Sequence, residues 1–133
     1  MKYFNSISSI SAVVMGAISY LLGGWDILVI SLLIMMMLDY ISGILKGIYK
    51  KELSSKTGLK GILKKIMILM IVCLSVLCEK IGVPAIREIT IVFFAVNEGL
   101  SILENAAEMG LPIPEAVKDA LLQLRESNEK GDK

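Results

Sequence analysis

Long apolar runs alternate with short polar breaks along the chain, and the breaks indicate where each helix begins and ends. No charged residue lies between Phe4 and Trp25, and Asp39 is the only one between Ile27 and Lys46. Uncharged stretches of about 18–20 residues are typical of helices that cross a bilayer. We therefore expect an all-α membrane protein with four transmembrane helices, at roughly residues 7–22, 27–45, 62–78 and 87–107.

The second predicted helix carries one charge, Asp39, inside an apolar run. A charged side chain at the bilayer centre costs about 2.5–3.5 kcal/mol, so Asp39 is expected near an interface, against a partner or protonated. One interpretation is a contact in an oligomer or a pore. The other is a local pair with Lys46 or Lys50 near the lipid headgroups.

Small residues recur at helical spacing in the first two predicted helices. Ala12 and Gly16 lie in the first, and Gly43 and Gly47 form a GxxxG pair in the second. Because lipid provides no hydrophobic drive for helices to associate, small residues in a bilayer mark close helix–helix approach. These four residues are therefore predicted packing positions.

A lysine-rich segment separates the second and third predicted helices, around a polar loop expected at residues 52–58. Seven of the fourteen basic residues lie in or beside it: Lys46, Lys50, Lys51, Lys56, Lys60, Lys64 and Lys65. Short loops rich in Lys and Arg stay in the cytoplasm, and neither of the other two turns carries an excess of bases. Four spans then place both termini in the cytoplasm, an N-in, C-in topology.

The fourth predicted helix has polar residues along one face. They are Thr90, Asn97, Ser101, Glu104 and Glu108. The favoured interpretation is a membrane-embedded stripe that faces a lumen or a helix–helix seam, since the opposite face is apolar. The alternatives are a span that ends near Val96 with a solvated stripe, and a re-entrant or interfacial helix. The candidate pore or helix–helix polar positions are Asp39, Asn97, Glu98, Ser101 and Glu104.

A break at Gly110–Pro114 ends this helix, and Pro114 suits the first turn of the next one. Apolar residues then recur at helical spacing, at Ile113, Val117, Ala120, Leu121 and Leu124. This pattern predicts an amphipathic helix at residues 114–126. The expected division is a transmembrane domain at 1–109, followed at 110–133 by a cytoplasmic amphipathic helix and a polar tail.

Composition excludes several function classes. Hydrophobic residues make up 55% of the 133 residues, and the mean hydropathy of +0.70 is too high for an ordinary soluble domain of this size. There is no histidine, and Cys73 and Cys78 are best interpreted as small apolar residues. We therefore expect no enzyme activity, metal or cofactor. No nucleic-acid partner is expected either, because the lysines flank apolar segments.

Two blocks of this sequence resemble the phage lysis and toxin-secretion holin family. The first runs from Asp39 to Lys65, and the second runs from Asn97 to Asn105 and continues to Pro114. Together they cover about half of the chain. The positions that match the family pattern are Asp39, Gly43, Ser54, Ser55, Gly58, Gly61, Lys65, Glu98, Ser101, Glu104, Asn105, Gly110 and Pro114.

The resemblance implies a small, multi-pass protein of the bacterial cytoplasmic (inner) membrane, encoded by a phage or prophage. Such proteins form homo-oligomers in the lipid bilayer and open lesions at a set time. An endolysin, or in some cases a large toxin, leaves the cell through these lesions as cargo. The alternative is a non-lytic scaffold that recruits a cytoplasmic partner through residues 114–124, or a transporter subunit, although the internal repeats typical of carriers are not evident.

Overall fold

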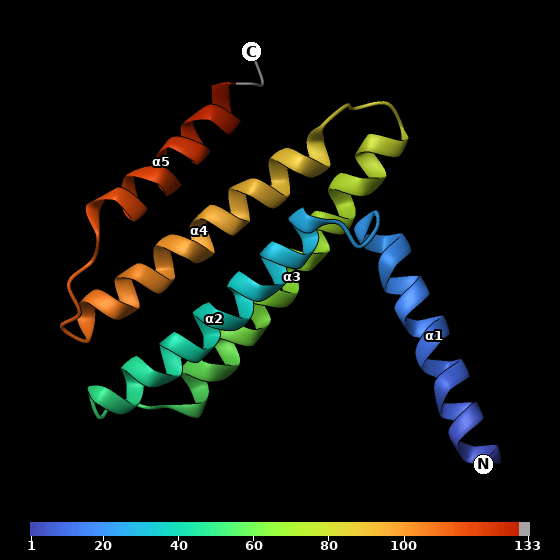
Figure 1. The fold of residues 1–133 in the computed structure, drawn as a ribbon, viewed down its shortest axis with the longest axis horizontal. Helices are drawn as coiled ribbons and strands as arrows, with labels where there is room; N and C mark the ends of the chain where they lie inside the picture. Colours follow the sequence, from blue (N-terminus) through green and yellow to red (C-terminus); the bar gives the residue numbers. More distant parts are fainter. Residues whose placement is uncertain (131–133) are drawn as a thin grey trace.

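In this computed structural model, which describes residues 1–130, the chain forms five α-helices and no strand (Figure 1). The helices are α1 (Lys2–Leu22), α2 (Ile27–Tyr49), α3 (Ser55–Lys80), α4 (Ile86–Glu108) and α5 (Glu115–Lys130). The all-α prediction is confirmed. The last three residues of the predicted polar tail, 131–133, lie outside the described part of the chain.

Three of the helices, α1, α2 and α3, are long and apolar enough to cross a membrane. Helix α4 is not among them, and polar residues such as Asn97, Glu98, Glu104 and Asn105 interrupt its second half. A four-span protein with an N-in, C-in orientation therefore stays a prediction, as does the division at residue 109.

Helix α3 begins earlier than the apolar pattern suggests. Residues 52–58 were expected to form a loop, and that prediction is wrong for its second half. Ser54 has an extended backbone (φ −137°, ψ 129°), and its carbonyl accepts the hydrogen bond of Gly58 N–H at 3.0 Å. A helix is held by hydrogen bonds between backbone groups, whatever the polarity of its side chains, so α3 extends beyond its apolar part. The lysines at 56, 60, 64 and 65 therefore lie on α3.

Helix α4 holds the bundle together. It packs most extensively against α2, and also against α3 and α5. Figure 1 shows α4 running between α5 on one side and the α2–α3 pair on the other. Ile91 of α4 is fully buried with Leu32 of α2 and Val72 of α3 in one apolar core. Helix α4 is thus the most extensively packed helix of the described chain, although polar residues interrupt its second half.

Helix α1 extends away from the bundle (Figure 1), and only its last turn is packed. Leu22 is buried, and Gly23 ends the helix in the left-handed conformation (φ 77°). Ala12 and Gly16 are exposed, and no other part of the described chain lies within 4 Å of a Cβ built on Gly16. Their role in helix packing stays a prediction.

Helix α5 lies along α4 and runs back in the opposite direction (Figure 1). The Leu121 side chain packs on Gly99 of α4, where an added Cβ would be 3.2 Å away. Asn128 Nδ2 donates a hydrogen bond to the Ile89 carbonyl oxygen at 2.8 Å. Val117 and Leu124 remain exposed, so α4 covers only one edge of the predicted amphipathic stripe.

Candidate functional site

A largely buried ion-pair cluster joins α2, α3 and α4. Lys65 Nζ on α3 donates to Asp39 Oδ2 on α2 at 2.7 Å, and also to Glu98 Oε2 on α4. The exposed side-chain fractions are 15% for Lys65, 17% for Asp39 and 5% for Glu98. One ammonium group therefore compensates two carboxylates whose side chains are both largely buried.

Amide and hydroxyl groups extend this cluster along the α2–α4 contact. Asn105 Nδ2 donates to Ser42 Oγ at 2.9 Å and, at 3.4 Å, to Asp39 Oδ1. Ser42 Oγ in turn donates to the Asp39 carbonyl oxygen at 2.9 Å. A Cβ on Gly43 would lie 3.9 Å from Asn105 Nδ2, an ordinary contact, so space alone does not require glycine there.

The cluster is fully hydrogen-bonded but not electrically neutral. Throughout residues 1–130, no buried side-chain nitrogen or oxygen lacks a hydrogen-bond partner. Asp39, Lys65 and Glu98 together carry a formal charge of −1 when all three are ionised. Burying charges is costly, and pairing repays that cost only with good geometry and full hydrogen bonding. Such a cluster restricts which faces of the three helices can meet, and by itself it is weak evidence for stability.

Arg87 makes a second polar junction, at the opposite end of the bundle. Its Nη1 donates to Asp26 Oδ2 at 2.7 Å, and its Nε donates to the Leu22 carbonyl oxygen at 2.8 Å. Asp26 also caps α2 by accepting from Val29 N–H at 3.0 Å. The hydrogen bond from Arg87 holds the pKa of the Asp26 carboxyl below its usual range. Arg87 thus ties the α1–α2 turn to the start of α4.

A third ion pair closes the end of α4 onto the lysine-rich segment. Glu108 lies 2.5 Å from Lys50 Nζ and 3.5 Å from Lys46 Nζ. The hydrogen bond from Lys50 lowers the pKa of Glu108, and the same bond raises the pKa of Lys50. Because these side chains are exposed, the pair is worth little in stability. It nevertheless places the end of α4 beside the basic end of α2.

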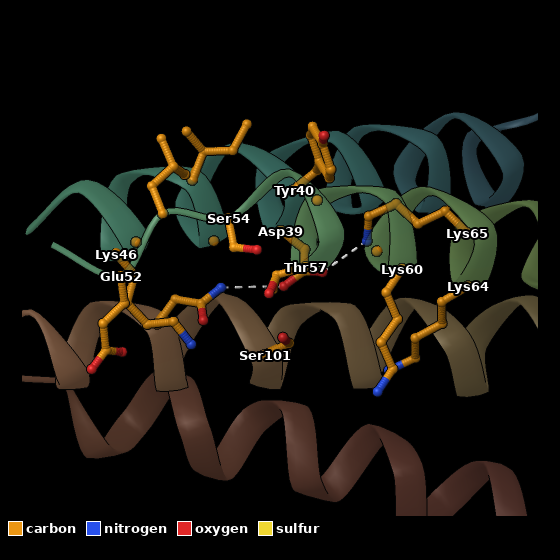
Figure 2. A pocket seen from close by; sticks show the side chains of 17 residues that line it. Asp39, Tyr40, Lys46, Glu52, Ser54, Thr57, Lys60, Lys64, Lys65 and Ser101 are labelled. Carbon is orange, nitrogen blue, oxygen red and sulfur yellow. Dashed lines mark hydrogen bonds and ion pairs between the residues drawn. The ribbon is translucent and has the colours of Figure 1, made fainter. Parts of the chain in front are cut away.

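A cavity of about 320 Å³ opens beside the ion-pair cluster, between α2, α3 and α4. Figure 2 shows Asp39, Tyr40 and Ser101 around it, with Lys60 and Lys64 extending from α3. Its lining also includes Gly43 and Gly47 of α2, which are predicted packing positions, and two glycines of α3. The charged members of the lining are Asp39, Lys46, Glu52, Lys60, Lys64 and Lys65.

The structure brings together some of the predicted polar positions and separates others. Asp39 and Glu98 share Lys65, and Ser101 lines the cavity beside them. Asn97 is half-buried and Glu104 is exposed, so neither belongs to the cluster. A role for any of these residues in a pore stays a prediction.

The alternative for Asp39, a local pair with Lys46 or Lys50, is wrong. Those two lysines reach Glu108 of α4, whereas Asp39 pairs with Lys65 of α3. The reason is geometric. Lys46 and Lys50 follow Asp39 by seven and eleven residues, about 10 and 16 Å along the helix at 1.5 Å per residue. A partner on the neighbouring helix is closer.

Two residues of these junctions were missed or misjudged from the sequence. The sequence predicts Lys65 as a topology-setting lysine and as a position that matches the family pattern, but not as the partner of Asp39. It predicts no role for Arg87. A usable signal existed for both. Asp39 and Glu98 are acids in apolar surroundings that require a shared cation, and Lys65 is the lysine nearest the apolar part of α3. Arg87 and Asp26 lie in the two turns predicted on the same side of the membrane.

A family profile and several known proteins are similar to this chain. The profile of the bacteriophage holin family matches residues 16–126. The "Probable holin" of Bacillus phage phi105 is 30% identical over 131 residues, which cover 96% of this chain and 90% of that protein. The "Uncharacterized 14.9 kDa protein in nagH 3'region" of Clostridium perfringens is 44% identical over 109 residues, or 80% and 83% of the two chains. The Listeria monocytogenes protein Lmo0128 is 44% identical over 125 residues, 89% of each chain. No solved structure matches.

Proposed function

The chain belongs to the bacteriophage holin family, and we propose that it acts as a holin. It accumulates in the bacterial cytoplasmic membrane, assembles with further copies of itself, and opens lesions through which an endolysin or a large toxin leaves the cell. The observation that carries this proposal is the ion-pair cluster of α4 with α2 and α3. It lets a helix rich in polar residues pack beside two apolar helices that are long enough to cross a bilayer.

In the single chain, the charged groups of the cluster face one another rather than lipid. Asp39 and Glu98 are both compensated by Lys65, which lowers the cost of keeping them in apolar surroundings. Glu104 lies on α4 outside this cluster and is exposed. In the proposed mechanism, association of copies through exposed faces such as that of α1 turns the polar side of α4 toward water, and a lesion opens.

Inducible expression in a bacterium tests the proposal, with the membrane potential followed by a voltage-sensitive dye. A holin gives a delay and then an abrupt loss of potential, and lysis follows when an endolysin is co-expressed. Absence of any abrupt loss at high expression would refute the lytic function. Glu98→Leu and Asn97→Leu are expected to shift the onset, with Glu88→Leu, an exposed acid at the start of the same helix, as the matched control. Normal onset in both variants would refute only the role of the polar side of α4.

The non-lytic scaffold makes a different prediction for α5. Val117 and Leu124 are exposed on α5, which has no buried residue, and this favours a partner for that helix. If the chain is a scaffold, removing residues 111–133 abolishes its function while no loss of membrane potential occurs with the full chain. If it is a holin, the full chain depolarises the membrane whether or not a second protein is present.

A further inference from the structure

We propose that the cavity at the lysine-rich ends of α2 and α3 binds the headgroup of an anionic phospholipid, and that an adjoining groove holds one of its acyl chains. The proposal rests on the membrane location within the proposed function, and it does not depend on lysis. Its ligand is a lipid of the phosphatidylglycerol class, with one negative phosphodiester and two apolar chains.

Two lysines at the cavity carry positive charge that no ion pair compensates. Four lysines and two carboxylates line the cavity. Two of the lysines are already paired, Lys65 with Asp39 and Glu98, and Lys46 with Glu108, which lies outside the lining. Lys60 and Lys64 form no ion pair anywhere in residues 1–130. These are the two lysines available to an anion.

Lys60 and Lys64 are placed to act on one ligand together. They are four residues apart on α3 and therefore neighbours on one face of the helix, where two like charges destabilise it slightly. Figure 2 shows both side chains extending in the same direction, beside the cavity that they line. A phosphate held between them would remove this repulsion. The two ammonium groups supply the charge, and hydroxyl groups supply directed hydrogen bonds.

Four hydroxyl groups line the same cavity, those of Tyr40, Ser54, Thr57 and Ser101 (Figure 2). The Ser54 hydroxyl precedes α3 but makes no capping hydrogen bond to the helix. Its donor is therefore free for another acceptor. Phosphodiester oxygens accept hydrogen bonds from hydroxyl groups and from ammonium groups alike, so this lining suits a phospholipid headgroup.

An apolar groove continues from this cavity between α2 and α3. Its volume is about 270 Å³, and all of its lining residues except Lys65 are apolar or aromatic. Tyr40 and Lys65 line both the cavity and the groove, so the two adjoin. The remaining groove residues are Met36, Met37, Ile62, Ile66 and Leu69. A charged region that passes into an apolar groove matches a lipid, with its headgroup and acyl chain, better than it matches a soluble anion.

The position of the site along the helices agrees with a lipid of the cytoplasmic leaflet. The cavity lies at the ends of α2 and α3 that carry most of the lysines, and loops of this kind stay inside. Basic pockets between membrane helices on the cytoplasmic side are suited to the headgroups of acidic lipids. The packing of α2 against α3 is slight compared with the packing of either helix against α4, which leaves room for an acyl chain.

Native mass spectrometry of the full-length, delipidated protein in detergent tests the proposal. Phosphatidylglycerol is titrated in, and phosphatidylcholine with the same acyl chains serves as the neutral reference. We expect phosphatidylglycerol to bind at least about tenfold more tightly, and the double variant K60Q/K64Q to lose about tenfold in affinity. The control is K51Q/K56Q, which removes two lysines from the same segment but outside the cavity. It is expected to change the affinity less than about twofold.

Equal losses in the two double variants would overturn the proposal, because they would show general attraction to a basic segment. Equal binding of the two lipids would overturn it as well. Glycerol 3-phosphate distinguishes a lipid from a soluble anion. If it binds as tightly as phosphatidylglycerol, and Ile66→Asn in the groove weakens neither, then no acyl chain is recognised and the proposal is wrong. Weakening of phosphatidylglycerol alone by Ile66→Asn supports it. Loss of the holin function in cells would leave all of these outcomes unchanged.

Discussion

Lys65→Met removes the one ammonium group that Asp39 and Glu98 share, while it keeps an extended side chain at that position. The nitrogen–oxygen distance to Asp39 is 2.7 Å. At that distance and an effective dielectric constant of about 20, the attraction is about 6 kcal/mol before desolvation is subtracted. Deleting one partner of a buried ion pair costs about 3–5 kcal/mol in measured cases, because the other charge loses its compensation. Two carboxylates lose it here, so we expect the upper end of that range.

The same count of charges predicts that Glu98→Gln is mild. It leaves one carboxylate, Asp39, paired with one ammonium group, Lys65, and the glutamine amide oxygen still accepts a hydrogen bond. The expected cost is about 1 kcal/mol in the free energy of unfolding. Adding Asp39→Asn and Glu98→Gln to Lys65→Met should recover most of the stability lost in the single variant, since no uncompensated charge then remains.

Unfolding in mixed detergent micelles, followed by circular dichroism, measures these differences. Lys56→Met is the control, because Lys56 is an exposed lysine on the same helix that forms no ion pair within residues 1–130. It should lie within about 0.5 kcal/mol of the unchanged protein. If Lys65→Met is no more destabilising than Lys56→Met, or if Glu98→Gln costs as much as Lys65→Met, the reasoning is refuted.

Further variants test the two glycine contacts and the Arg87 junction. Gly23→Ala is expected to cost at least about 2 kcal/mol in the same unfolding assay, because the residue has φ 77° and its Cβ would lie 2.6 Å from Arg87 Nε; Gly16→Ala, in open space on α1, should cost nothing. Gly99→Ile is expected to displace α5 from α4 and to speed hydrogen exchange in α5, and unchanged exchange would contradict that packing. Asp26→Asn should lower stability by only about 1 kcal/mol at neutral pH, because the ion pair of Asp26 with Arg87 is only partly shielded from water. Since the folded pKa of Asp26 is lowered, this stabilisation is complete above about pH 4 and is lost as the pH falls through the folded value, so the two proteins should converge in acid.

The positions of the helices were predictable from the sequence, because the breaks between them use residues with strong local preferences. Gly23 and Gly24 end α1, and both have positive φ angles. Pro114 precedes the start of α5 at Glu115. The apolar pattern predicted the start of α3 too late. Such a pattern marks only the part of a helix that suits lipid, whereas the helix itself begins before that part. The charged first turns of α3 are helical by hydrogen bonding alone.

The contacts between helices were less predictable, because they join residues distant in sequence. Helical spacing placed Glu98 on α4, but it does not tell which neighbouring helix that side faces. The partner, Lys65, is 33 residues away, and Asp39 is a further 26. Charge balance limits the choice, since buried acids require a cation, but several lysines satisfy that rule. Only the three-dimensional arrangement of α2, α3 and α4 selects Lys65.

The contacts of α4 also set an order in time for assembling this protein. Arg87 forms hydrogen bonds with Leu22 and Asp26, 65 and 61 positions earlier, and Asn105 reaches back 63 positions to Ser42. Because synthesis runs from the N-terminus to the C-terminus, α1, α2 and α3 are made before the helix that joins them. Contacts between residues so far apart form slowly. The first three helices have few contacts with one another, so the bundle is complete only once α4 has been made.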